Sequence, residues 1–190
     1  MNKLLNISRF IMQFEKPKAV KLEKIDSLFI DYIENLTEFA DKNYNKYNFY
    51  HPAIKLREFL WEIFASHYLE IINNRVYNQE NKFTKQESDS AKYTLHFLLE
   101  RILTLLYPII PQITSVIANE KNIDLLKEKF PKAKTGKSDM KLIKKIMEFD
   151  SDVWKIKKDK GLSLREHISG IKIPNELKAF EKDLKACHNL

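Results

Sequence analysis

The chain has 190 residues, of which 44% are hydrophobic and 31% are charged, enough for one sizeable core or one core with a small appendage. All three glycines lie beyond residue 135, so the first 135 residues lack the glycines that tight turns between strands usually need and are predicted to be helical. The net charge of +7 favours an anionic partner, nucleic acid above all. The single cysteine, Cys187, excludes an internal disulfide and fits a reducing, cytoplasmic setting.

No segment has the pattern of a membrane span. The most apolar stretch, 102–113, is too short to cross a bilayer and contains Pro108 and Pro111. Arg9 interrupts the apolar stretch at the start of the chain, and no small-residue cleavage site follows, so a secretion signal is not predicted. We therefore expect no membrane partner.

Two helices are predicted before residue 50. The first covers about 2–14, and the basic connector EKPKAVKLEK at 15–24 follows it. Apolar residues then recur at intervals of three and four from Phe29 to Ala40, which predicts a second helix with Asp26 as its N-cap.

A long third helix is predicted from Pro52, which suits a first helical turn. Its apolar residues come in adjacent pairs that repeat every four residues, from 59 and 60 to 71 and 72. Because an α-helix has 3.6 residues per turn, this repeat predicts a buried stripe that winds around the central helix of a bundle. His67 lies beside the stripe and is expected to be packed and hydrogen-bonded rather than a metal ligand.

A fourth helix is predicted to begin at a T-x-x-E capping box, Thr84 and Glu87, and to reach Tyr107. The segment YPIIPQI at 107–113 predicts a rigid corner, after which a fifth helical stretch continues through Ile117.

The sequence changes character after Pro131. Residues 132–139, KAKTGKSD, are predicted to be a linker, and a basic amphipathic helix follows to Lys160. Ile168, Ile171 and Ile173 indicate a short strand, and Pro174 opens a last helix. The predicted organisation is a mainly α, up-and-down helical-bundle domain at 1–131 and a small basic α/β appendage at 132–190.

Catalytic and metal-binding motifs are weak. KTGKS at 134–138 lacks the first glycine of a phosphate-binding loop and has no strand before it. The five histidines have no partner at metal-ligand spacing, and no serine or cysteine nucleophile signature occurs. We predict no catalytic residue and no metal site. The basic helix with Trp154 is compatible with phosphate binding and equally with a solvated lysine face over a local core.

Three segments carry a family resemblance. HPAIKLREFLWEIFASHYLEIINNRVY at 51–77 matches a W-x-x-F-x-x-x-Y-[LI]-E pattern through Trp61, Phe64, Tyr68, Leu69 and Glu70. NKLLNISRFI at 2–11 and YTLHFLLERILTLLYPIIPQIT at 93–114 fit the segments expected on either side. This order resembles the anticodon-binding domain of class I aminoacyl-tRNA synthetases of the valyl, isoleucyl and leucyl group. KKDKGLSLREHI at 157–168 is similar to a K-G-L-S-L stretch of archaeal-type valyl enzymes and favours valyl over isoleucyl.

The resemblance implies an all-helical bundle that binds the anticodon arm of tRNA, specifically tRNA-Val, in the cytoplasm. It implies that catalytic and editing domains of the same polypeptide, absent here, use ATP and Mg to join valine to tRNA, while this region holds no cofactor and is not catalytic. The alternatives are an isoleucyl-tRNA synthetase fragment and a non-catalytic helical protein-interaction domain.

Bundle geometry indicates where such a partner would bind. In an up-and-down bundle the connections after the first and third helices lie at the same end. Lysine and arginine can hold phosphates there, and a tyrosine can stack on an unpaired base. The predicted contact residues are Lys16, Lys18, Lys21, Arg75, Tyr77, Asn78 and Lys82.

Overall fold

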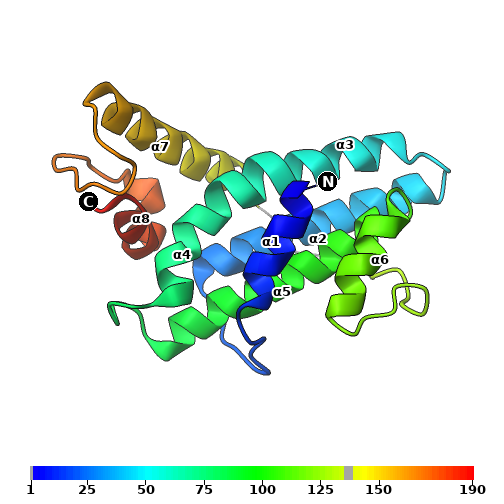
Figure 1. Cartoon of the computed structure of the whole chain (residues 1–190). Helices are drawn as coiled ribbons and strands as arrows, with labels where there is room; N and C mark the ends of the chain where they lie inside the picture. The colour runs from blue at the N-terminus through cyan, green and yellow to red at the C-terminus, as the bar shows by residue number, and fades with distance from the viewer. Residues whose placement is uncertain (1, 135–138) are drawn as a thin grey trace.

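The computed structural model describes residues 2–134 and 139–190, and every regular element in these two ranges is a helix (Figure 1). The elements are α1 Asn2–Met12, α2 Lys24–Tyr44, α3 Tyr50–Glu58, the π-helix η1 Phe59–Tyr68, α4 Leu69–Tyr77, α5 Lys85–Leu106, α6 Pro111–Glu120, α7 Met140–Asp159, the 3₁₀-helix η2 Asn175–Phe180 and α8 Glu181–His188. The helical bundle predicted from the sequence is confirmed. Residues 135–138, inside the predicted linker, lie outside the described ranges. No helix in the described part of the chain is both long and apolar enough to cross a membrane.

The predicted third helix is one rod made of α3, η1 and α4, and its middle third is a π-helix. The i→i+5 hydrogen bonds of a π-helix widen each turn beyond 3.6 residues. The spacing of 3.6 residues per turn, on which the predicted winding of the stripe depends, therefore does not apply within η1. All three apolar or aromatic pairs in this segment are buried, whereas Glu62 is exposed.

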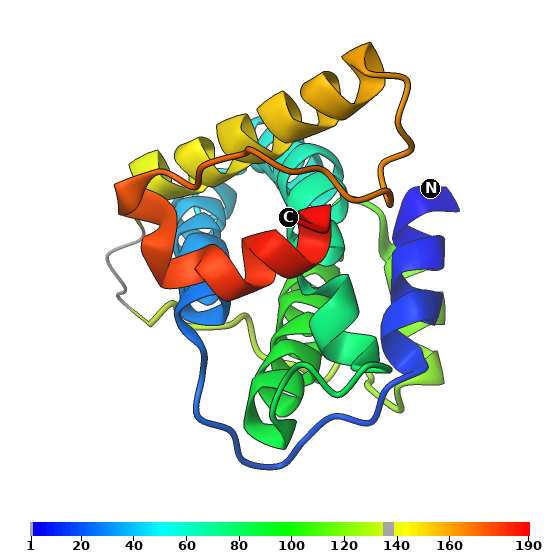
Figure 2. The ribbon, with the colours of Figure 1, turned by 90° about the vertical axis from the view of Figure 1, so that its left-hand side faces the viewer.

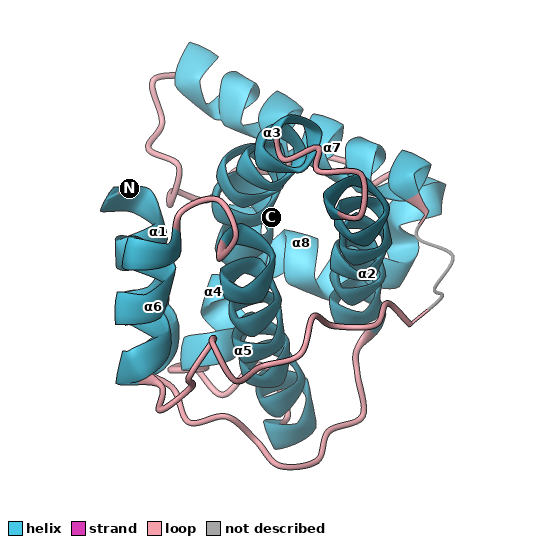
Figure 3. Cartoon of the chain, turned by 90° about the vertical axis from the view of Figure 1, so that its right-hand side faces the viewer, coloured by secondary structure: helices cyan, strands magenta, loops and turns pink. Residues whose placement is uncertain are grey.

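The rod lies among the other bundle helices, as its apolar repeat predicted. Helices α2 and α5 are the longest elements and run along it (Figure 3), while α1 and α6 lie next to each other against α5 (Figure 1). Large apolar side chains from α1, α2, the rod and α5 form one core, with Ile11, Phe29, Phe59, Phe64 and Ile102 fully buried. The predicted central position of the third helix is confirmed.

One helix start agrees with the sequence prediction and another does not. Thr84 accepts a hydrogen bond from the Glu87 amide (3.2 Å) and Glu87 accepts one from the Thr84 amide (2.6 Å), so the capping box of α5 is present. Asp26 is not the cap of α2, because the helix begins at Lys24 and Asp26 is buried inside its first turn. Its carboxylate is used elsewhere, as described below.

The C-terminal segment, residues 139–190, covers one end of the bundle (Figures 1 and 2). Helix α7 buries Ile143, Ile146, Phe149 and Val153, and α8 packs against α4. The strand predicted at 168–173 is wrong: these residues form an irregular stretch between α7 and η2, with a bend at Gly170. No strand lies in the described segment to pair with it, and the Ile168 amide instead donates to the Asn189 carbonyl (3.2 Å). The division into domains at 131/132 stays a prediction.

Candidate nucleic-acid interface

The connections 13–23 and 78–84 lie at the same end of the bundle, which we call the tip (Figure 2). Aromatic side chains join the two: the Tyr77 ring lies edge-on to Phe14 (ring centroids 5.3 Å) and to Phe10 (6.1 Å). The Gln86 side chain also donates to the Glu23 carboxylate (3.3 Å). The turn at 45–49 and the corner at 107–110 lie at the opposite end (Figure 1).

Five of the predicted contact residues are exposed, namely Lys16, Lys18, Lys21, Tyr77 and Lys82. Lys18 and Lys21 have no side-chain partner among the described residues, and Lys82 pairs with the adjacent Glu80. Tyr77 is 44% exposed, with its remaining surface against the two phenylalanines. Its ring therefore has a fixed inner side and a free outer side, which is the arrangement that stacking on a base requires.

Arg75 does not lie on this surface. Its side chain is 1% exposed, and one guanidinium nitrogen donates to Asp26 Oδ1 (2.6 Å). Its Nε lies 3.3 Å from Asp183 Oδ1 on α8. A phosphate cannot reach a guanidinium enclosed in this way, so the predicted phosphate contact of Arg75 does not hold in this structure.

Arg75 belongs to a buried network centred on Asp26. Asp26 Oδ1 also accepts a hydrogen bond from the Tyr68 hydroxyl (2.6 Å), and Oδ2 accepts one from Ser90. Burial, together with the Asp26 carboxylate, raises the pKa of Tyr68 well above its usual value, so Tyr68 stays a hydrogen-bond donor. Burial raises the pKa of Asp183 to about 6 even though Arg75 favours its charged form. The network joins α2, α4, α5 and α8.

Lys16 and Asn78 have intramolecular partners. Lys16 Nζ lies 2.6 Å from Glu100 Oε2, and this pair fastens the 13–23 connection to α5. Asn78 adopts a left-handed conformation (φ 45°) that ends α4, and its side-chain amide bonds both the Phe83 carbonyl (2.7 Å) and the Phe83 amide (3.0 Å). Asn78 therefore closes the 78–83 loop.

A second buried polar cluster joins the C-terminal segment to the rod. The Asp150 carboxylate lies 3.0 Å from His67 Nδ1 and 2.8 Å from His188 Nε2, and all three side chains are buried. Trp154 stacks on His67 (ring centroids 5.2 Å) and lies edge-on to His188 (5.8 Å). His67 is thus packed and hydrogen-bonded as predicted, and the half-buried Trp154 packs against both histidines. No group of His, Cys, Asp or Glu in the described ranges is arranged to hold a metal ion.

Comparison with known sequences now identifies the family. The profile described as the anticodon-binding domain of tRNA ligases matches residues 26–172, more than three quarters of the chain. The chain belongs to this family. The anticodon-binding domain that was expected from three short sequence segments is therefore confirmed.

Relatives of this anticodon-binding domain are valine–tRNA ligases. Those of Aeropyrum pernix and Nanoarchaeum equitans are each 34% identical to the chain, over 98% and 100% of its length respectively. The ligase of Pyrobaculum aerophilum is 30% identical over the whole chain. In each case the match covers 24% of the relative, so the chain spans about a quarter of the length of these curated relatives.

The anticodon-binding domain also has cations near the tip that sequence reasoning missed. Lys182 of α8 pairs with Glu87 at the start of α5 (2.6 Å) and lies over the Phe83 ring (4.7 Å). Lys185 and Arg165 line a surface hollow together with Lys182 and Phe83. Their lysine and arginine identity was visible in the sequence, but nothing in the spacing indicated that α8 would dock against α4 beside the tip.

Proposed function

We propose that this anticodon-binding domain is the part of a valine–tRNA ligase that holds the anticodon arm of tRNA-Val. The ATP-dependent joining of valine to tRNA would take place in catalytic and editing domains of the same polypeptide. The identity and near-complete coverage of the chain by valine–tRNA ligases support valyl over isoleucyl.

The observation that carries the proposal is that the connections 13–23 and 78–84 lie together at the tip. Lys18, Lys21 and Lys82 present positive charge there, and the half-exposed Tyr77 offers a supported ring. Cations that contact phosphates fix the position of a nucleic acid without reading its sequence, while an aromatic ring can stack on an unpaired base of a loop. An anticodon loop has both features.

The test is binding of a tRNA-Val transcript, followed by fluorescence anisotropy at several salt concentrations. The variant K18E/K21E/K82E reverses three charges at the tip. We expect its affinity to fall by at least tenfold at low salt, with a shallower dependence on salt, because each lost phosphate contact lowers the slope by about one. Tyr77→Ala should weaken binding with little change in slope, since stacking releases no counterions.

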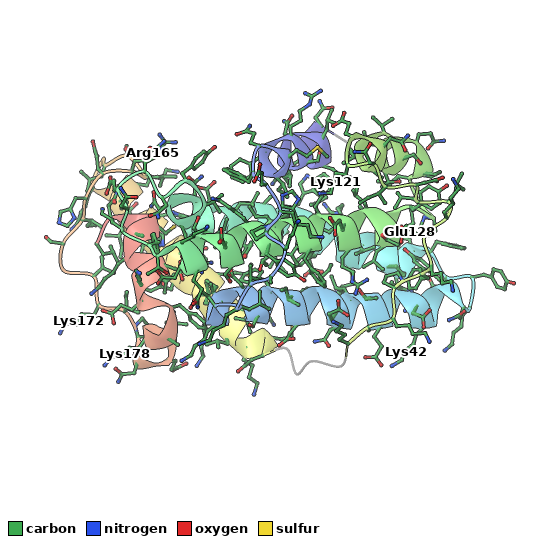
Figure 4. The ribbon with its side chains drawn as sticks, turned by 90° about the horizontal axis from the view of Figure 1, so that it is seen from below. Lys42, Lys121, Glu128, Arg165, Lys172 and Lys178 are labelled. Atoms are coloured by element: carbon green, nitrogen blue, oxygen red, sulfur yellow. The ribbon has the colours of Figure 1, made fainter. Side chains whose placement is uncertain are left out.

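A matched control reverses the same number of charges at the opposite end. Lys42, Lys46 and Lys55 lie near the 45–49 turn, and Figure 4 labels Lys42 there. K42E/K46E/K55E should bind within about twofold of the parent chain if the tip is the site. Equal losses in both variants would show that only the net charge matters and would contradict the proposal. Undetectable binding by the parent chain at low salt would contradict it as well.

A further inference from the structure

A basic hollow of about 510 Å³ lies between the tip and the C-terminal segment. Cationic side chains from three separate stretches of sequence surround it, and no carboxylate side chain lines it. These cationic residues are Lys82, Arg165, Lys182 and Lys185, with His167 beside them. Because Lys82 belongs to the tip, the hollow continues the proposed RNA surface onto the C-terminal segment.

Asn189 fixes the far wall of this hollow. Its left-handed conformation (φ 50°) ends α8, and its side-chain amide donates to the Arg165 carbonyl (2.7 Å). Its own carbonyl lies 2.7 Å from His167 Nδ1 and also accepts a hydrogen bond from the Ile168 amide (3.2 Å). The loop that carries Arg165 is therefore held against the end of α8 in the absence of any ligand.

The bundle fixes the near wall. The Asn74 side chain donates to the Ala186 carbonyl (2.5 Å), and the Arg75–Asp183 and Lys182–Glu87 pairs join α8 to α4 and α5. The hollow is thus formed by segments whose relative positions are already set. A preformed site loses less entropy on binding than one that a ligand must organise.

The cations of the hollow remain available to a phosphate. Three have carboxylate partners outside its lining: Lys82 with Glu80, Lys182 with Glu87, and Lys185 with Glu181. The pairs of Lys82 and Lys185 are exposed on both sides and contribute only about 0–1 kcal/mol each, so a phosphate can displace them, while the Lys182–Glu87 pair keeps α8 in place. The Arg165 guanidinium has no side-chain partner among the described residues, and a guanidinium can bind a phosphate with two parallel hydrogen bonds.

Arg165 is not needed to balance the free carbonyls at the C-terminus of α8. Positive groups near a helix C-terminus can balance its free carbonyls. At the end of α8 the buried Lys157 does this, because its ammonium donates to the His188 carbonyl and to the Leu164 carbonyl (both 2.7 Å). Arg165 makes no such contact.

We propose that the hollow binds the phosphate backbone of RNA next to the segment held at the tip, with Arg165 as its central phosphate contact. This inference rests on the proposed function and extends the same surface. The ligand is the backbone and not a base, because Phe83 is 6% exposed and its ring is covered by Lys182. Contacts of this kind position the RNA and carry no sequence information.

The test compares two double variants of the C-terminal segment. R165Q/K185Q removes two charges from the hollow. K172Q/K178Q removes two from the other side of the same segment, as Figure 4 shows for Arg165, Lys172 and Lys178. With tRNA-Val at low salt, we expect R165Q/K185Q to bind on the order of tenfold more weakly, with a salt slope lower by about one to two. The loss should be the same for a tRNA with a different anticodon. K172Q/K178Q should stay within twofold.

The outcomes separate this inference from the proposed function. If the tip variant K18E/K21E/K82E loses affinity while R165Q/K185Q does not, the hollow is no RNA site and the proposed function stands. If both double variants lose affinity equally, general charge explains the loss and the inference is wrong. If neither the parent chain nor any variant binds tRNA, the proposed function is wrong, and the inference that rests on it is wrong as well. Thermal unfolding of R165Q/K185Q, expected within 2 °C of the parent, shows that the fold is kept.

Discussion

The interior of the bundle and the joint between the bundle and the C-terminal segment are built from different contacts. Away from the joint, α1, α2, the rod and α5 meet through apolar side chains such as Ile11, Ile33 and Leu103. At the joint, Arg75 meets Asp26 and Asp183, and Asp150 meets two histidines. Among the described residues, most of the buried Asp, Glu, Lys and Arg side chains lie there.

This difference indicates how each region should respond to a single change. Apolar contacts depend on volume and are indifferent to protonation, whereas a buried charged group depends on its partners and on the cost of burying its charge, which changes with pH. We therefore expect the joint to be the region where removing one charge costs most and where pH matters.

The largest effect is expected at Asp26. Asp26→Ala leaves the buried Arg75 charge without its 2.6 Å partner and removes the acceptor for Tyr68 and Ser90. Breaking a buried pair in this way costs about 3–5 kcal/mol of the free energy of unfolding, measured in urea. The control is Asp31→Ala on the same helix, whose partly exposed carboxylate has no ion pair among the described residues and which should cost under about 0.5 kcal/mol. Similar losses for the two variants would mean that the network adds nothing.

Asp183 should make stability depend on pH. Its pKa of about 6 in the folded chain exceeds the ordinary value of 3.8, so folding favours the protonated carboxyl. This contribution is fully present below the ordinary pKa and is lost as the pH rises through about 6. At 1.36 kcal/mol per pKa unit, the change amounts to up to about 3 kcal/mol.

The variant Asp183→Asn isolates this contribution because it cannot titrate. We expect the free energy of unfolding of the parent chain, relative to that of the variant, to fall between pH 4 and pH 7.5. Urea titrations at pH 4, 5, 6 and 7.5 measure the difference. A constant difference between the two proteins across this range would show that Asp183 does not titrate as the structure indicates.

The sequence predicted the apolar interior of the bundle but not the polar contacts of the joint. Periodicity predicted the helices and the central rod, because an apolar repeat reports burial along one helix. The up-and-down topology also predicted that the connections after the first and third helices would lie at the same end of the bundle. Neither could predict the burial of Arg75, because its partners Asp26 and Asp183 lie 49 and 108 residues away along the chain, and nothing local shows that they converge.

Two local predictions failed for related reasons. The N-cap assigned to Asp26 follows from a common pattern, but the carboxylate is drawn inward by Arg75, Tyr68 and Ser90. The strand at 168–173 was inferred from spaced isoleucines, which record burial on one side but not the presence of a partner strand. In both cases a contact distant in sequence decided the outcome.

A smaller effect is expected at Asp150. Asp150→Asn weakens two hydrogen bonds of a buried carboxylate, to His67 and to His188, and should cost about 2 kcal/mol. The loss should be local. Amide hydrogen exchange is expected to speed up in α7 and α8 while α5 keeps its protection. Asp152→Asn, two residues further along α7 and exposed, serves as the control and should change neither region. Faster exchange throughout the bundle would contradict a separate joint.

The smallest effect tests whether helix capping at the tip is coupled to the joint. Thr84→Ala removes the acceptor for the Glu87 amide and should cost about 1 kcal/mol. Glu87 also accepts from Lys182 of α8, and these hydrogen bonds outweigh the effect of burial and lower the pKa of the Glu87 carboxyl. If the capping box holds the Glu87 carboxylate in the position where it accepts from Lys182, the double variant Thr84→Ala/Lys182→Ala should lose less free energy of unfolding than the sum of the two single losses. Additive costs in a double-mutant cycle, measured by urea unfolding, would mean that α5 is capped independently of α8 and that the joint begins only at Asp183.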